Sequence, residues 1–168
     1  MTEEVKYNPD KAHYIVATAI VVKDGKYLLT KRSEKEKAFP GRWTVPGGTL
    51  EQSDYEREKD SKYQWYNVLE NLVRREVKEE TNVDIKNIGY ITSLTFIRPD
   101  GVPTVVISFY ADYASGEVQM LTEDEIDFAW VTLEEAKNYD LIEGIYEEIE
   151  MLDRKLKGEK IGEWKATR

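Results

Sequence analysis

The segment Arg75-Glu76-Val77-Lys78-Glu79-Glu80 ends a helix that the residue pattern predicts over residues 66–81. On a helical wheel, the apolar residues of this helix gather on one side (Val68, Leu69, Leu72, Val73 and Val77). Glu76, Glu79 and Glu80 fall within the arc of that apolar side, and their spacing of three and four residues makes them neighbours in space. The sequence therefore predicts three carboxylates beside the core.

Carboxylates at this spacing repel one another, and their removal from water adds a further free-energy cost. Protonation of the carboxyl groups relieves the repulsion, and so does a bound cation. Oxygen ligands of this kind suit Mg²⁺ or Mn²⁺. The alternative is that the helix end protrudes and its glutamates are solvated, and the wheel alone leaves both alternatives open.

The segment Pro46-Gly47-Gly48 lies upstream of this helix and favours a sharp bend with close approach of the backbone to another group. Glu51 and Asp54 follow it within a few residues. A loop with carbonyl and carboxylate oxygens, followed by a helix with carboxylates, is a suitable cage for a hard cation.

The pattern resembles the Nudix box, in which Gly, five residues, Glu and seven residues precede Arg-Glu-aliphatic-x-Glu-Glu-x-Gly-aliphatic. Here Gly48 and Asp54 have the first spacing, and residues 75–83 match the second half except at Asn82. Three departures stand out. Asp54 replaces Glu; 20 residues instead of 7 separate Asp54 from Arg75, so 13 are additional; and Asn82 replaces Gly. Asparagine tolerates the left-handed conformation expected at this helix end.

This resemblance implies hydrolysis of a pyrophosphate bond in a nucleoside diphosphate linked to another moiety, such as a nucleotide sugar, an ADP-ribose-like compound or a nucleoside triphosphate. It implies Mg²⁺ or Mn²⁺ as cofactor, with Glu76 and Glu80 as principal ligands. Glu79 is expected to be a further ligand or the base that activates water, and the Gly47 carbonyl a further ligand.

The resemblance also assigns positioning and substrate contacts. Arg75 is expected to orient a glutamate, and an acid from a late loop, Glu123 or Glu125, to complete the catalytic set. The arginines that flank the expected site are candidates for phosphate binding (Arg32, Arg42 and Arg98). Three aromatic residues of the insertion are candidates for stacking on a base, although aromatic residues near a helix start more often pack in the core (Tyr63, Trp65 and Tyr66).

Periodicity and turn signals predict a mixed α/β (α+β) fold, and the resemblance makes it an α/β/α sandwich around a mixed β-sheet. One domain over residues 1–168 is expected, with its core at about 13–137. After a lead-in over 1–12, strands are predicted at 14–22, 27–30, 43–45, 83–96 (one or two strands), 103–113 and 128–131. Besides the helix at 66–81, a short helix after a capping box at Thr132 and a longer helix at 141–157 are predicted.

Composition limits the function further. A net charge of −9 disfavours binding to long nucleic acids, whereas a divalent cation still allows a small phosphorylated nucleotide. The chain has no cysteine and a single histidine, His13, which excludes thiolate and multi-histidine sites. Neither a signal peptide nor a membrane-spanning run is present, so a cytoplasmic protein without membrane association is expected.

Two alternatives accompany the hydrolase hypothesis. A nucleotide-binding module of the same fold without turnover is disfavoured by the three glutamates, which such a module is free to lose. An isomerase acting on an isoprenoid diphosphate commonly recruits a cysteine and several histidines, and this chain lacks that set. Many members of the family form homodimers, so the resemblance allows a homodimer as the oligomeric state of this protein.

Overall fold

The computed structural model describes residues 6–167; residues 1–5 of the predicted lead-in and residue 168 lie outside the described part. None of the helices within residues 6–167 has the length and apolar character that crossing a bilayer requires. The strands are β1 (Tyr14–Lys23), β2 (Lys26–Arg32), β3 (Trp43–Thr44), β4 (Gly47–Thr49), β5 (Asp84–Ile97), β6 (Pro103–Ser115) and β7 (Glu125–Val131). The helices are α1 (Val68–Thr81), α2 (Leu133–Ala136) and α3 (Ile145–Leu156), with 3₁₀ turns at Pro9–Lys11 and Gln52–Tyr55.

A single mixed sheet contains all seven strands, in the order β3-β2-β1-β6-β5, with β4 against β1 and β7 against β2. The pairing of β1 with β6 is parallel, from Tyr14 opposite Thr104 to Val22 opposite Asp112. The remaining strand pairs are antiparallel. The predicted mixed sheet is therefore confirmed.

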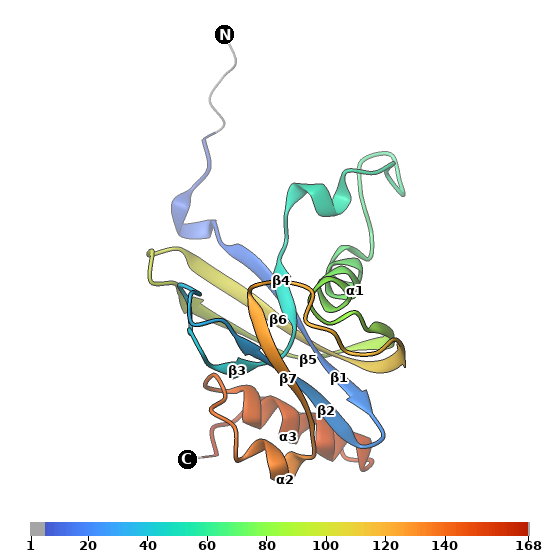
Figure 1. Ribbon diagram of the computed structural model, residues 1–168. Coiled ribbons are helices and arrows are strands. Elements are labelled where there is room, and N and C mark those ends of the chain that lie inside the picture. Colours follow the sequence, from blue (N-terminus) through green and yellow to red (C-terminus); the bar gives the residue numbers. More distant parts are fainter. Residues whose placement is uncertain (1–5, 168) are drawn as a thin grey trace.

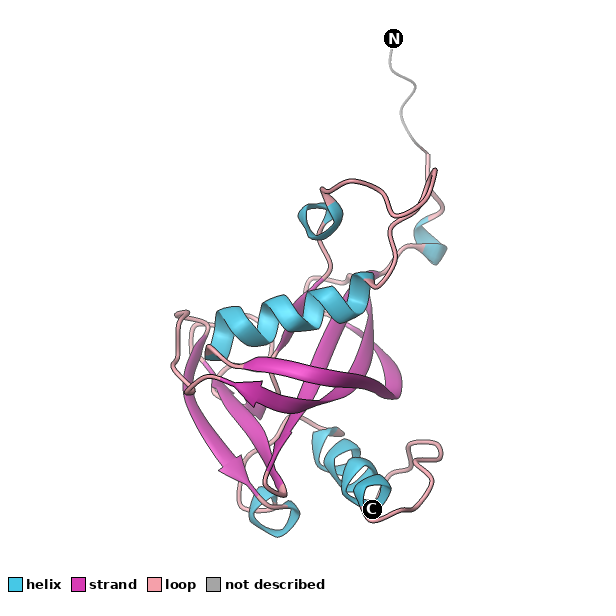
Figure 2. Cartoon of the chain, turned by 90° about the vertical axis from the view of Figure 1, so that its right-hand side faces the viewer, coloured by secondary structure: helices cyan, strands magenta, loops and turns pink. Residues whose placement is uncertain are grey.

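Helices cover both faces of the sheet (Figure 1, Figure 2). Alternation along β1 directs Ala17, Ala19 and Val21 toward the α1 side, where they pack with Leu72 and Val77. The opposite face packs against α2 and α3 through a second cluster that includes Ile20, Tyr27, Leu29, Ile149 and Leu152. This three-layer arrangement agrees with the predicted α/β/α sandwich.

Several predicted boundaries differ from the structure. Helix α1 begins at Val68 rather than residue 66, because Asn67 is left-handed at φ 55°. The last helix begins at Ile145 rather than 141, since Leu141 bridges to Trp43 and Gly144 has a φ of 90°. Strand β7 begins at Glu125 rather than 128, because its first residues pair with Arg32 and Lys31 of β2. This earlier start places Glu125 on a strand.

Two local predictions are confirmed. Asn82 ends α1 in the left-handed conformation at φ 64°, and its N–H donates to the Lys78 carbonyl. Thr132 and Glu135 form the predicted capping box at the start of α2. The end of α1 is thus fixed by the residue that replaces the glycine of the box.

Candidate active site

Two glycines of β4 bring the backbone against the carboxylates of α1. The Gly47 N–H donates a hydrogen bond to Glu80 Oε2 at 3.3 Å. The α-carbon of Gly48 lies so close to the Glu76 carboxyl group that a Cβ at this position would overlap it. The close approach predicted for Pro46-Gly47-Gly48 is therefore present, and it is to the acidic end of the helix.

Arg75 gathers three carboxylates beside this contact. Its Nε donates to Asp54 Oδ1 at 2.6 Å, and its Nη1 lies 2.9 Å from Glu76 Oε1 and 3.0 Å from Glu79 Oε2. The Asp54 side chain is 4% exposed. Aspartate thus reaches the arginine despite its shorter side chain and the 13 additional residues that follow it. These contacts are those that an orienting role for Arg75 requires.

The prediction that three acids of α1 lie on its buried side is correct for Glu76 and Glu80 and wrong for Glu79. The Glu76 side chain is 15% exposed, whereas that of Glu79 is 55% exposed. Arg75, one turn earlier, donates to the Glu79 carboxylate at the surface. Glu79 consequently lies at the outer edge of the acidic group.

Glu80 and Glu125 are the most strongly perturbed acids of the site. Burial raises the pKa of Glu80 to about 9, and the charges of Glu125 and Glu76 add to the rise. Burial also raises the pKa of Glu125 to about 7 and raises the pKa of Glu76 in spite of the adjacent Arg75. For each group, the cost of burial outweighs the stabilisation of the ionised form by its nearby donors and cations.

The donor chemistry of this group fits a hard divalent cation. Glu125 Oε2 is buried and has no hydrogen-bond partner within the described part of the chain. A dication would neutralise Glu80 and Glu76, and a water molecule beside it would give Glu125 Oε2 a hydrogen-bond partner. In residues 6–167 no three acidic or histidine side chains already surround a common point as a ligand set. Two carboxylates of α1 are instead turned toward Arg75.

A cavity of about 520 Å³ opens beside the acidic group, and Gly47, Gly48 and Glu125 form part of its wall. Two of the three predicted phosphate-binding arginines, Arg32 and Arg98, also line it. Arg32 lies 3.8 Å from Glu125 Oε1 and pairs with Glu36 at 2.8 Å. Arg98 pairs with Asp100 and lies over the Tyr14 ring. The cavity thus combines the Glu125 carboxylate with guanidinium groups, while the carboxylates of α1 do not line it.

The third predicted arginine, Arg42, lies elsewhere. Its Nε is 3.1 Å from Asp140 Oδ2, and its guanidinium donates to the Asp140 and Leu141 carbonyls. It does not line the cavity. Arg42 therefore attaches the segment before α3 to the sheet, a role that its place in the sequence did not reveal.

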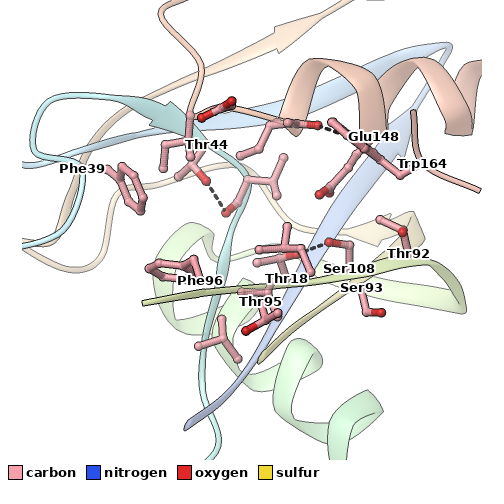
Figure 3. A pocket seen from close by; sticks show the side chains of 18 residues that line it. Thr18, Phe39, Thr44, Thr92, Ser93, Thr95, Phe96, Ser108, Glu148 and Trp164 are labelled. Atoms are coloured by element: carbon pink, nitrogen blue, oxygen red, sulfur yellow. Dashed lines mark hydrogen bonds between the residues drawn. The ribbon is translucent and has the colours of Figure 1, made fainter. Parts of the chain in front are cut away.

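Sequence reasoning missed two lysines and a second cavity. Lys35 and Lys37, from the charged loop before β3, line the first cavity. The second cavity, of about 430 Å³, lies between β5, β6 and α3 and is shown in Figure 3. Seven residues line both cavities (Val16, Thr18, Phe39, Thr44, Val45, Phe96 and Ile142). The two spaces are therefore continuous, and the second contains a buried acid, Glu148, that no sequence motif marked.

The aromatic residues of the insertion take no part in either cavity. Trp65 packs on Tyr55 with ring centroids 5.4 Å apart, and its indole N–H donates to the Arg57 carbonyl. Tyr63 and Tyr66 are exposed. The insertion projects from one end of the molecule (Figure 1). Trp65 and Tyr55 instead line a separate, more open hollow together with Arg57. Tyr63 and Tyr66 do not line it, so base stacking by these residues stays a prediction.

A family model described as the NUDIX domain matches residues 13–152 of this chain. The chain belongs to the NUDIX family. Among curated relatives, the NUDIX protein "Nucleoside triphosphatase NudI" of Escherichia coli (strain K12) is 27% identical over 137 residues, covering 75% of this chain and 86% of the relative. The NudI of Klebsiella pneumoniae (strain 342) is 29% identical over 136 residues with the same shares covered.

Solved NUDIX structures share the fold. The MutT NUDIX hydrolase from Burkholderia pseudomallei aligns with a TM-score of 0.66 at 22% identity, covering 83% of this chain and 98% of its own. The NUDIX domain of Shewanella oneidensis NrtR, crystallised with ADP ribose, aligns with a TM-score of 0.68 at 23% identity, covering 89% and 94%. Family membership and the triphosphatase relatives identify the chain as a Nudix-type pyrophosphohydrolase.

Proposed function

We propose that this protein hydrolyses nucleoside triphosphates, and related nucleoside diphosphate derivatives, in a reaction that depends on Mg²⁺ or Mn²⁺. The observation that carries the proposal is the cavity that joins Glu125 and the Gly47-Gly48 backbone to Arg32 and Arg98. The triphosphatase named among the relatives supports a triphosphate as the first substrate to test. ADP-ribose, present in one neighbouring structure, represents the derivatives.

The cationic side chains define the phosphate end. Lys35 and Lys37 lie in the same cavity wall as the two arginines, so four positive groups face this space. One guanidinium group can donate two parallel hydrogen bonds to two oxygens of a phosphate, and a lysine ammonium group adds a compact positive charge. This arrangement allows a polyphosphate to bind a protein of net charge −9.

The carboxylates define the metal end. Glu76, Glu80 and the Gly47 carbonyl are the proposed ligands, and Glu79 is a further candidate that must first leave Arg75. A bound Mg²⁺ supplies Lewis-acid stabilisation of the charge that develops on the phosphate oxygens. Arg75 keeps Glu76 and Asp54 in place during the reaction.

We assign the general base to Glu125 rather than Glu79. Glu125 lines the cavity and its Oε2 has no hydrogen-bond partner among the described residues, whereas the Glu79 carboxylate is largely exposed and pairs with Arg75. Water attacks a phosphorus atom while Glu125 Oε2 takes its proton. The bridging P–O bond then breaks, and the departing phosphate keeps the electron pair.

The test is a panel of nucleoside triphosphates, ADP-ribose, nucleotide sugars and dinucleotides, assayed with Mg²⁺, with Mn²⁺ and with chelator. Metal-dependent release of phosphate or pyrophosphate is expected for at least the triphosphates. Glu125→Gln should abolish most turnover, and Glu123→Gln, an exposed neighbour outside the cavity, should not. Absence of metal-dependent turnover for every compound would support the binding-module alternative.

A further inference from the structure

The second cavity contains a buried acid that the proposed phosphate chemistry does not use. Glu148 of α3 is 3% exposed and lines this cavity (Figure 3). No lysine, arginine or histidine of residues 6–167 lines the same space. A carboxyl group buried without a cationic partner is costly, so a ligand with N–H donors would offset the cost of burying Glu148.

The surroundings of Glu148 are mostly neutral. From the sheet, β1, β5 and β6 present hydroxyl and apolar side chains (Thr18, Thr92, Ser93, Thr95, Ser108 and Val106). The titratable neighbours are Glu143 in the cavity wall and Glu147 on the same helix. Burial raises the pKa of Glu148 to about 7, and a hydrogen bond with Ser108 opposes the rise. The group therefore changes its charge near neutral pH.

The position of the cavity suits the nucleoside part of the substrate. It continues from the phosphate end past Phe39 and Phe96, whose ring centroids lie 5.9 Å apart. Trp164 of the C-terminal segment forms another wall, and its indole N–H donates to the Gly144 carbonyl at 3.4 Å. A volume of about 430 Å³ lies within the usual range for small-molecule sites.

We propose that Glu148 recognises the nucleobase of the substrate and selects guanine. An ionised carboxylate is a double acceptor, and guanine alone among the common bases presents two adjacent N–H donors, at N1 and the 2-amino group. A protonated carboxyl is one donor and one acceptor, and it pairs with an edge of any common base. Selection for guanine therefore rests on the ionised form. This inference depends on the proposed function for its substrate class.

The experiment compares kcat/KM for GTP, ATP, CTP, UTP and ITP at about pH 6 and about pH 8.5. Inosine lacks only the 2-amino group of guanine. GTP should be preferred over ATP and ITP by about tenfold or more at the higher pH, and less at the lower pH. Glu148→Gln, whose amide is a donor and an acceptor, should reduce this preference to within about threefold and remove its pH dependence.

The control variant is Glu150→Gln, because Glu150 lies on the same helix, pairs with Arg154 and does not line the cavity. It should retain the wild-type preference. An equal fall for all five nucleotides in Glu148→Gln, or no guanine preference in the wild type, overturns the inference while the proposed function stands. If no nucleotide is hydrolysed, the proposed function fails, and calorimetric affinities for GMP, IMP and AMP then decide the role of Glu148 by the same comparison.

Discussion

The Glu76 carboxyl group lies against the α-carbon of Gly48, so residue 48 has no room for a side chain. Gly48→Ala is expected to leave the fold intact, because the atoms in its way belong to the end of a flexible side chain. Displacement of Glu76 should lower kcat by about 10- to 100-fold. Steady-state kinetics with Mg²⁺ and a thermal unfolding curve measure the two effects separately.

Gly47→Ala provides the matched comparison. A Cβ at this position would lie 2.5 Å from the Ala17 carbonyl oxygen and 2.8 Å from the Thr18 α-carbon. Both atoms belong to the β1 backbone, so this variant should lose about 1–3 kcal/mol of unfolding free energy. Equal stability for the two variants would contradict the assignment of Gly48 to the site and Gly47 to the sheet.

Arg98→Ala and Arg42→Ala should affect different properties. Arg98 lines the cavity, so its loss should raise KM for a triphosphate roughly tenfold with little change in kcat. Arg42 holds Asp140 and Leu141, so its loss should lower the unfolding midpoint and leave KM unchanged. A rise in KM for Arg42→Ala alone would reverse the two assignments.

Mg²⁺ should stabilise the chelator-treated protein, because a cation that binds only the folded state adds to its stability. At about 100 times its dissociation constant, the gain corresponds to roughly 5–10 °C in midpoint. Glu80→Gln should abolish most of this shift, and Glu70→Gln, from the first turn of α1, should retain it. An unchanged shift in Glu80→Gln would remove Glu80 from the ligand set.

Glu148 should make stability depend on pH. Its pKa is raised in the folded protein, from an ordinary 4.5 to about 7, so the folded state favours the neutral form. The resulting stability is fully present below about pH 4.5 and is lost as the pH rises through about 7, by at most about 3 kcal/mol. Urea unfolding at about pH 5 and pH 8.5 should show a smaller decrease for Glu148→Gln than for the wild type.

The insertion should be dispensable for turnover. The hydrogen bonds of residues 56–66 join residues of that segment to one another. They include the Arg57–Asp60 pair and bonds to Gln64 and Tyr66. Replacing residues 57–66 by a short Gly-Ser linker should change stability by less than about 1 kcal/mol and leave kcat/KM unchanged. A large fall in kcat/KM would show that the insertion contacts the substrate.

The helix-end acids, the glycine pair and the left-handed end of α1 were predictable from the sequence because each depends on local spacing. Glu76 and Glu80 follow the helical repeat, Gly48 permits the close approach, and Asn82 permits the left-handed end. Each of these features needs only a short stretch of chain. The contact between Gly48 and Glu76, 28 residues apart, was expected from the resemblance to the Nudix box, which joins the two segments.

The rest of the site depends on long-range pairing. Glu125 was one of two candidate acids, and the pairing of β7 with β2 brings it beside Arg32. Residues 140–148 pass close to the sheet, so that Arg42 binds the Leu141 carbonyl and Glu148 lines the second cavity. No local pattern encodes these contacts, because they depend on the order of strands and on where α3 packs.

The parallel pairing of β1 with β6 also bears on the order in which the molecule assembles. Partners such as Ala17 and Ile107 are 90 residues apart, whereas β1 and β2 are joined by a two-residue turn. Long-range pairing of this kind slows folding because a large loop must close first. During synthesis, the hairpin of β1 and β2 can therefore form early. The pairing of β1 with β6 can form only after residues 103–115 have left the ribosome.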